Sequence, residues 1–122
     1  MKKLTSDEII QKYLESANII ESVTMTTDYR TNNREVKKIL KLFLLLEQDI
    51  DLAKKVYSCL LESDIPVAQS MASADCLRLN IYIDEAQKKL EELSKRDDIG
   101  IRSFSAEMAL KIWRGEVPGK KL

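Results

Sequence analysis

Apolar residues recur along this chain at spacings of three and four, the period of an α-helix with one buried side. The pattern is clear near the start, where Thr5 and Glu8 have capping-box spacing and apolar residues follow up to Ile20. A first helix is therefore predicted over about 6–22. The same period predicts five further helices, over about 28–47, 50–62 and 66–79, then from about 84 and from about 101 to 115.

Residues with special backbone preferences lie between these segments. Pro66 suits the first turn of a helix, because that turn does not use the N–H that proline lacks. Asn80 tolerates the left-handed conformation that ends many helices, and Gly100 precedes the last helix. Thr27 or Asp28 can cap the second helix.

The second helix carries more apolar residues than one buried side requires. Its apolar run from Leu42 to Leu46 predicts that this helix is central and covered on two sides. The expected core also includes Phe104, whose replacement by alanine should then cost about 3–5 kcal/mol. Other side chains expected in the core are Val36, Leu40, Leu52, Cys59, Ile101, Met25, Met71 and Met108.

An internal repeat indicates how the helices are arranged. A shift of 34 positions aligns Leu-Ala-Lys-Lys-Val at 52–56 with Ala-Gln-Lys-Lys-Leu at 86–90, and Asp-Ile-Pro-Val at 64–67 with Asp-Ile-Gly-Ile at 98–101. A repeated helix-turn-helix unit is typical of α-solenoids. The predicted fold is all-α: a HEAT-like right-handed α-α superhelix of six helices in three antiparallel hairpins. Residues 1–116 are expected to form a single helical-repeat domain, and 117–122 a short polar tail.

Composition narrows the function. Lys plus Arg equals Asp plus Glu at 20 each, which argues against direct binding of nucleic acid or of a membrane surface through excess positive charge. The chain has no histidine, the usual general base and the commonest metal ligand, and only three glycines for phosphate-binding loops. A protein that is not an enzyme, and that uses no cofactor or metal, is therefore expected.

Cysteine usage and the start of the chain indicate the compartment. Cys59 and Cys76 are expected to be reduced, buried side chains rather than a disulfide. The first residues turn acidic at Asp7 and Glu8, unlike a secretory signal, and no apolar run approaches the roughly 20 residues of a membrane span. A cytoplasmic protein is expected.

The later helices carry a family resemblance. The stretch 65–81 looks like a HEAT-like repeat, and Gly-Ile-Arg-Ser-Phe at 100–104, followed by Ala-Glu-Met at 106–108 and by Trp113, resembles the end of a small bacterial all-α family of unknown function. Several members of that family are similar to immunity proteins of contact-dependent growth inhibition and other polymorphic toxin systems. The resemblance implies a cytosolic protein that binds a cognate toxin domain, often a nuclease, and it brings no catalytic motif. A helical-repeat adaptor for another cytosolic protein is the alternative.

Carboxylates at the predicted turns are the first candidate binding residues. Glu62 and Asp64 lie at one turn and Asp97 and Asp98 at the equivalent turn of the next repeat, while a second edge carries Asp49 and Asp51. A basic nuclease cleft would be met by such acidic groups, because complementary charge speeds encounter and fixes orientation. The competing interpretation is that each carboxylate caps a helix.

Two further surfaces remain open as alternatives. The outer face of the fourth and sixth helices would form the groove of a solenoid, or a solvated face with local ion pairs; it carries Asp75, Arg78, Arg102, Glu107, Lys111 and Arg114. The second helix carries a basic stripe, which could contact phosphates or simply be solvated; its residues are Arg30, Arg34, Lys37, Lys38 and Lys41. Interface anchors could come from Tyr29, Tyr57 or Tyr82.

Overall fold

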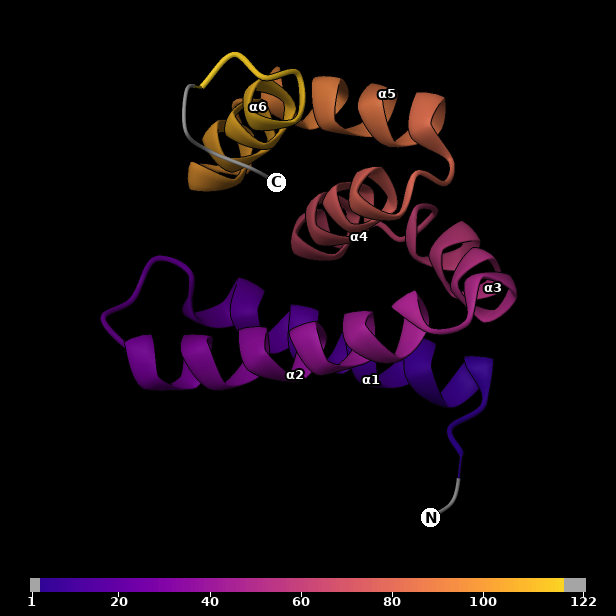
Figure 1. The fold of residues 1–122 in the computed structure, drawn as a ribbon. Helices are drawn as coiled ribbons and strands as arrows, with labels where there is room; N and C mark the ends of the chain where they lie inside the picture. The colour runs from indigo at the N-terminus through magenta and orange to yellow at the C-terminus, as the bar shows by residue number, and fades with distance from the viewer. Residues whose placement is uncertain (1–2, 118–122) are drawn as a thin grey trace.

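The computed structural model describes residues 3–117, and within them all regular structure is α-helical (Figure 1). The helices begin and end within two residues of the predicted positions. They are α1 (Ser6–Val23), α2 (Tyr29–Glu47), α3 (Ile50–Leu60), α4 (Pro66–Leu79), α5 (Ile83–Ser94) and α6 (Ile101–Trp113). The predicted all-α class is confirmed. Most of the predicted polar tail, 118–122, lies outside the described residues.

Local chemistry explains the helix ends. Thr5 Oγ1 accepts a hydrogen bond from the Glu8 N–H at 3.2 Å, and Glu8 Oε1 accepts one from the Thr5 N–H at 3.0 Å, which completes the predicted capping box. Asp28 caps α2 through the Thr31 N–H at 3.0 Å. Asn80 ends α4 with φ 58°, in the left-handed region.

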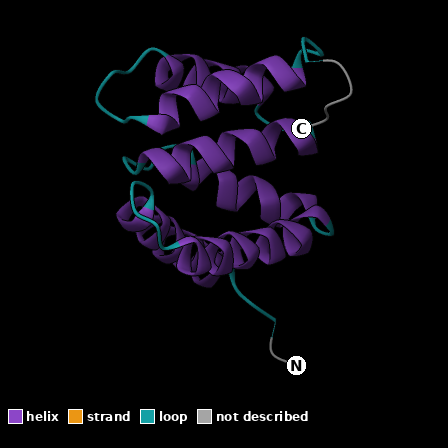
Figure 2. Ribbon diagram, turned by 90° about the vertical axis from the view of Figure 1, so that its left-hand side faces the viewer, coloured by secondary structure: helices purple, strands orange, loops and turns teal. Residues whose placement is uncertain are grey.

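The helices stack in successive layers from the N-terminal segment to the C-terminal one (Figure 2). α1 and α2 pack along each other in the lower part of Figure 1, α5 and α6 form the upper part, and α3 closes one side. α3 and α4 share fewer contacts than the other consecutive pairs of the predicted hairpins, and α4 packs chiefly against α5. The HEAT-like superhelix of three hairpins stays a prediction.

The central helix is α4, so the prediction that α2 is central was wrong. α4 contacts α1, α3, α5 and α6, and eight of its residues are buried: Val67, Ala68, Ser70, Ala72, Ser73, Asp75, Cys76 and Leu77. Most of these side chains are small, which lets neighbouring helices approach α4 from several sides. α2 instead lies at the periphery and leaves Leu40, Leu44 and Leu45 about half exposed. Consecutive residues of a helix point in different directions, so a five-residue apolar run cannot be buried by one neighbouring layer.

Several residues expected in the core are exposed. Cys59 is exposed, because it lies two positions from the buried Tyr57 and therefore points the other way, while the free Cys76 is buried as expected. Met25 lies in the α1–α2 connection and is largely exposed. Other members of the expected core are exposed on α2 and α6, namely Val36, Leu40, Ile101 and Phe104. Leu52 and Met71 are partly buried against the core, and Met108 is partly buried.

Phe104 gives a direct test of this correction. Its residue surface is 59% exposed, because α6 buries only the narrow arc around Ala106 and Leu110. We expect Phe104→Ala to lower the free energy of unfolding by less than about 1 kcal/mol in urea denaturation. Leu90→Ala, at a fully buried α5 position, is the matched control and should cost about 2–5 kcal/mol. A loss above about 3 kcal/mol in Phe104→Ala would place that ring in the core.

Candidate functional site

The four carboxylates at the predicted turns are all exposed, and we call them the acidic edge: Glu62, Asp64, Asp97 and Asp98. The end of α1 lies beside both turns. Glu21 accepts a hydrogen bond from the Val67 N–H at 3.1 Å, next to the α3–α4 turn. In the α5–α6 turn the hydrogen bond with Asp98 raises the pKa of Arg96, and the negative charge of Glu21 adds a smaller contribution. Glu62 also lines a hollow of about 440 Å³ that includes Lys88 and Lys89 of α5.

None of these four carboxylates caps a helix. The N-cap of α4 is Ile65 and that of α6 is Gly100, and neither of these residues makes a side-chain cap hydrogen bond. In the first turn of α4, the Val67 N–H donates to Glu21 of α1 instead. Asp98 instead forms a two-point ion pair with Arg96, at 2.9 Å to Nε and 2.8 Å to Nη2, which lowers the pKa of Asp98. Among residues 3–117, no salt bridge involves Glu62, Asp64 or Asp97. Capping through a side-chain hydrogen bond is therefore wrong for the acidic edge, whereas a favourable interaction of Asp64 and Asp98 with the helix dipoles stays a prediction.

The second edge, formed by Asp49 and Asp51, differs from the acidic edge because one of its carboxylates caps a helix. Asp49 caps α3 by accepting a hydrogen bond from the Leu52 N–H at 3.2 Å, as the capping interpretation expected. Asp51 lies in the first turn of the same helix and is exposed. Its negative charge is favourable there because the first turn of a helix carries a partial positive charge. Stabilisation of α3 is therefore sufficient to explain the positions of Asp49 and Asp51.

The expected groove on α4 and α6 is contradicted at Asp75, which is buried rather than exposed. The remaining side chains mostly pair within the protein. Lys111 pairs with Glu107 at 3.2 Å, as the helical spacing predicted, and Arg114 pairs with Glu91 at 2.7 Å. Arg102 is partly buried and donates to Thr24 Oγ1 at 3.3 Å, while Arg78 pairs with Asp75 at 3.3 Å. Sequence reasoning placed Asp75 on the surface because charged residues are rarely buried without partners.

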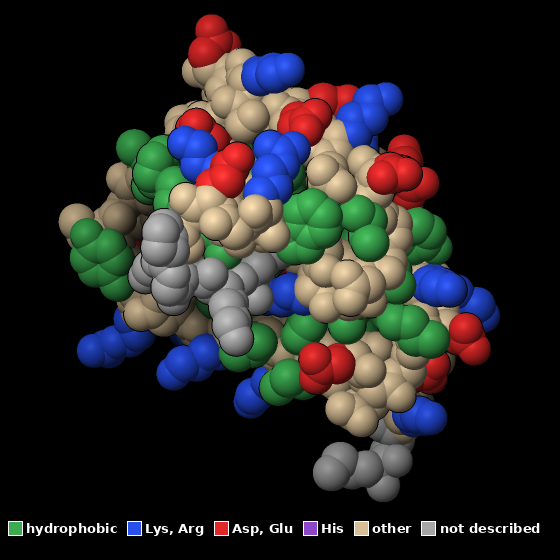
Figure 3. Space-filling model, turned by 45° about the horizontal axis from the view of Figure 1, so that its top comes forward, with side chains coloured by type: hydrophobic (Ala, Val, Ile, Leu, Met, Phe, Trp, Pro, Cys, Tyr) green, Lys and Arg blue, Asp and Glu red, His purple; other side chains and the backbone are tan. Residues whose placement is uncertain are grey.

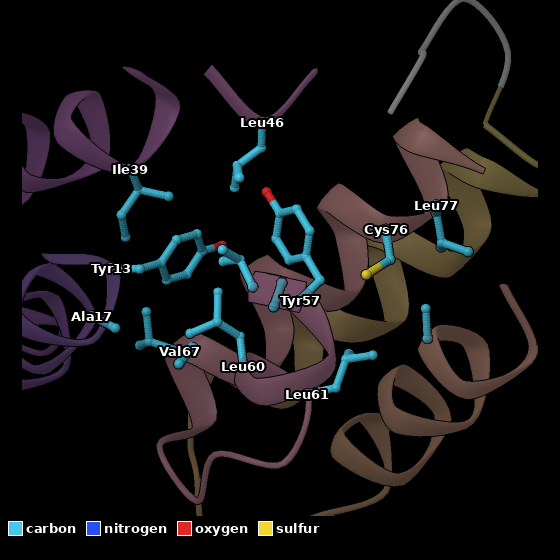
Figure 4. Close-up of a cluster of buried hydrophobic side chains, with 14 of the residues drawn as sticks. Tyr13, Ala17, Ile39, Leu46, Tyr57, Leu60, Leu61, Val67, Cys76 and Leu77 are labelled. Carbon is cyan, nitrogen blue, oxygen red and sulfur yellow. The ribbon is translucent and has the colours of Figure 1, made fainter. Parts of the chain in front are cut away.

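Asp75 is the acceptor of a buried network that joins three helices. Its Oδ2 accepts hydrogen bonds from the hydroxyls of Tyr13 in α1, at 3.0 Å, and Tyr57 in α3, at 2.8 Å. The two rings meet edge to face, with centroids 6.3 Å apart, inside the core (Figure 4). Burial raises the pKa of Asp75 to about 6, although the hydrogen bonds from both tyrosines and the charge of Arg78 oppose that rise. Tyr57 is therefore a core residue and not an interface anchor.

A second buried carboxylate joins α1 to α2. Glu35 accepts a hydrogen bond from the Ser16 hydroxyl at 2.9 Å and pairs with Arg34 at 3.1 Å and Lys38 at 3.0 Å. Burial disfavours its charged form, but the hydrogen bonds from Lys38, Ser16 and Arg34 outweigh burial and lower the pKa of Glu35. The buried negative charge of Glu35 therefore offsets part of the positive charge of the basic stripe on α2.

The exposed side of α2 is a surface that sequence reasoning missed. At 100° per residue, Tyr29, Val36, Leu40 and Leu44 form an apolar stripe, and the five basic residues predicted as a stripe lie directly beside it. With Asn33 these five line a shallow hollow of about 590 Å³: Arg30, Arg34, Lys37, Lys38 and Lys41. Basic side chains follow the lower left edge of Figure 3, next to hydrophobic ones. We call these nine residues, without Asn33, the α2 face. The sequence signal for this surface was the excess of apolar residues in α2. That excess was interpreted as evidence that the helix is central and covered on two sides.

Comparison of the chain with protein-family models, with curated proteins and with solved structures gives no match. In the part of the chain that the structure describes, no helix has the length and apolar character needed to cross a bilayer. Within the same part, no cluster of three or more Cys, Asp or Glu side chains is arranged to hold a metal ion. The structure thus defines an all-α protein with two exposed surfaces of opposite charge.

Proposed function

We propose that this protein is a cytosolic immunity protein that binds a cognate toxin domain, of nuclease type, and covers its active site or substrate path. Its last helices resemble a small bacterial family of unknown function, several members of which are similar to immunity proteins, and this resemblance suggests the activity. The observation that carries the proposal is the acidic edge, whose four carboxylates are exposed and cap no helix. Three of them, Glu62, Asp64 and Asp97, form no salt bridge among residues 3–117 and are available to a cationic partner.

The position of the acidic edge fits a basic cleft. Turns between helices project beyond the helix ends, so they can enter a concave surface that a flat helix face cannot. Nuclease clefts are basic because they bind phosphates, and exposed carboxylates opposite them accelerate association and fix orientation. Asp97 has no salt bridge among residues 3–117 and is free to make such contacts, whereas Asp98 must exchange Arg96 for the partner.

Charge reversal tests the proposal. The probe is the variable C-terminal domain of a large secreted protein encoded directly upstream, co-expressed with this chain. We expect the wild-type chain to restore growth. Asp97→Lys combined with Asp98→Lys should weaken binding of the purified domain by about 10–100-fold, mainly through slower association, with a smaller effect at high salt.

A matched control separates binding from folding and from total charge. Asp84→Lys combined with Glu85→Lys makes the same charge change on exposed residues at the other end of α5. We expect that variant to restore growth like the wild type. Its melting temperature should be slightly lower than that of the wild type, because it places two positive charges in the first turn of α5, and both variants should remain folded at the growth temperature. Failure of the wild-type chain to restore growth contradicts the function. Unchanged affinity in a folded Asp97→Lys, Asp98→Lys variant contradicts the role of the acidic edge.

A further inference from the structure

The α2 face carries an apolar stripe that no other helix within residues 3–117 covers. α2 packs against α1 and α3 through Ile39, Leu42 and Leu46, which point away from the α2 face. On the opposite side, Leu40 and Leu44 are each 49% exposed and Tyr29 is 69% exposed. Val36, Leu40 and Leu44 form the continuous part of the apolar stripe, and the exposed Asn33 separates them from Tyr29. An exposed apolar cluster of this kind on one helix is a common mark of a protein-binding site.

The charge along the middle of the stripe is basic, and the exposed carboxylates of α2, Asp28 and Glu47, lie at its two ends. Glu35 is the carboxylate within this row, and it is buried and already paired with Arg34 and Lys38. In residues 3–117, no salt bridge involves Arg30, Lys37 or Lys41. The surface therefore offers uncompensated positive charge along one flank of the apolar stripe.

We propose that the α2 face docks an amphipathic helical segment of an acidic protein partner, with apolar side chains on the stripe and carboxylates against the basic row. The stripe runs from Tyr29 to Leu44, which is about 22 Å at 1.5 Å per residue. A partner helix of about four turns matches that length. Its anchors would recur at spacings of three, four and seven, the usual pattern of helix-in-groove recognition.

Other occupants fit the α2 face less well. A second copy docked α2 to α2 would bring two basic rows into one interface, where the exposed carboxylates of α2, Asp28 and Glu47, lie at the helix ends rather than between the rows. A helix that lies on an anionic membrane carries Lys and Arg over its polar face, whereas α2 also exposes the carboxylates Asp28 and Glu47 at its two ends. A nucleic acid would leave the leucines unused, because bases stack on aromatic rings and Tyr29 is the one aromatic residue of the α2 face.

This inference is independent of the proposed function. The acidic edge would bind a basic toxin domain, whereas the α2 face would bind an acidic segment, so one chain could hold both. Substitutions on the α2 face should leave rescue from the toxin unchanged. The Asp97→Lys, Asp98→Lys variant should leave binding at the α2 face unchanged.

The test uses synthetic helical peptides of about 16 residues. One peptide carries leucines at helical spacing with glutamates along one flank, a second has lysines in place of the glutamates, and a third scrambles the acidic sequence. Fluorescence anisotropy with the wild-type chain should show micromolar binding of the acidic peptide, at least about tenfold tighter than of either other peptide. Leu40→Ser combined with Leu44→Ser should weaken that binding at least about tenfold.

Charge variants complete the design. Lys37→Glu combined with Lys41→Glu should lose the acidic peptide and gain the lysine peptide, while Lys88→Glu combined with Lys89→Glu on α5 is the matched control and should bind like the wild type. The proposal is overturned if the wild type shows no preference for the acidic peptide, or if the Lys37→Glu, Lys41→Glu variant binds it normally. Tighter binding to vesicles containing phosphatidylglycerol or to a single-stranded oligonucleotide, or a dimer lost in the double-serine variant, overturns it in favour of that occupant.

Discussion

Replacing Asp75 by alanine is expected to lower the free energy of unfolding by about 3–5 kcal/mol at pH 7, measured by urea denaturation. The substitution leaves the hydroxyls of Tyr13 and Tyr57 buried without their shared acceptor, because Asp75 Oδ2 receives both. It also opens a space in α4, the helix against which α1, α3, α5 and α6 pack. The loss therefore weakens the junction of three helices at once.

Two milder variants identify the cause of that loss. Tyr57→Phe removes one hydroxyl and leaves Asp75 its bond from Tyr13, so a cost of about 1 kcal/mol is expected. Asp75→Asn keeps an oxygen that can accept both tyrosine hydroxyls and carries no buried charge, so its stability at pH 7 should be at least that of the wild type. An Asp75→Ala variant within about 1 kcal/mol of the wild type would show that the network has no structural importance.

Helix positions were predictable because they depend on local sequence. The capping box of Thr5 and Glu8, the turn at Pro66 and the left-handed Asn80 each act within a few residues of the chain. Apolar spacing then fixed the length of each helix. None of these signals requires knowledge of which helix packs against which, and the bounds were therefore right within two residues.

The packing order was not predictable in the same way. The apolar content of α2 favoured it as the central helix of the fold. That content measures how many leucines a helix has, and it does not show how many neighbouring helices can cover them. The better signal was in α4, where Ala68, Ala72 and Ser73 allow close approach on several sides. A helix with small residues all round, and without a clear polar side, is typical of a central position.

The candidate functional surfaces were also only partly predictable from the sequence. Sequence placed the acidic edge at the correct turns, but carboxylates before a helix usually cap it, and only backbone geometry shows that Ile65 and Gly100 occupy the N-cap positions here. Asp75 was misplaced for the opposite reason. Its hydrogen-bond donors Tyr13 and Tyr57 are distant in sequence. No residue near Asp75 in the sequence therefore indicated that a buried carboxylate would find hydrogen-bond partners there.

A net charge of zero concealed two separate surfaces. The acidic edge lies at the α3–α4 and α5–α6 turns, and the basic row lies on α2. The net charge was used to argue against partners that require a basic patch, yet opposite charges on different helices cancel in that sum without cancelling in space. Charge per element was therefore more informative than charge per chain.

Acidification from pH 7.5 to pH 5 is expected to stabilise the wild type relative to Asp75→Asn by about 1–1.5 kcal/mol. The pKa of Asp75 is about 6 in the folded protein, and burial raises it from the ordinary value of about 3.8 that applies to the unfolded chain. The folded state therefore binds more protons between these two values. The stabilising contribution is fully present below about pH 3.8 and is lost as the pH rises through 6, with a total of about 3 kcal/mol.

The comparison with Asp75→Asn isolates this carboxyl group. Glu35, Asp28 and Asp98 have lowered pKa values, so their protonation destabilises the fold as the pH falls, and it does so in both proteins. Those contributions cancel in the difference between the two urea curves. A difference that stays flat from pH 7.5 to pH 5 would show that Asp75 keeps an ordinary pKa. A difference that falls would show that the tyrosine hydroxyls and Arg78 stabilise its charged form more than burial opposes it, because the sign of the slope follows the sign of the pKa shift.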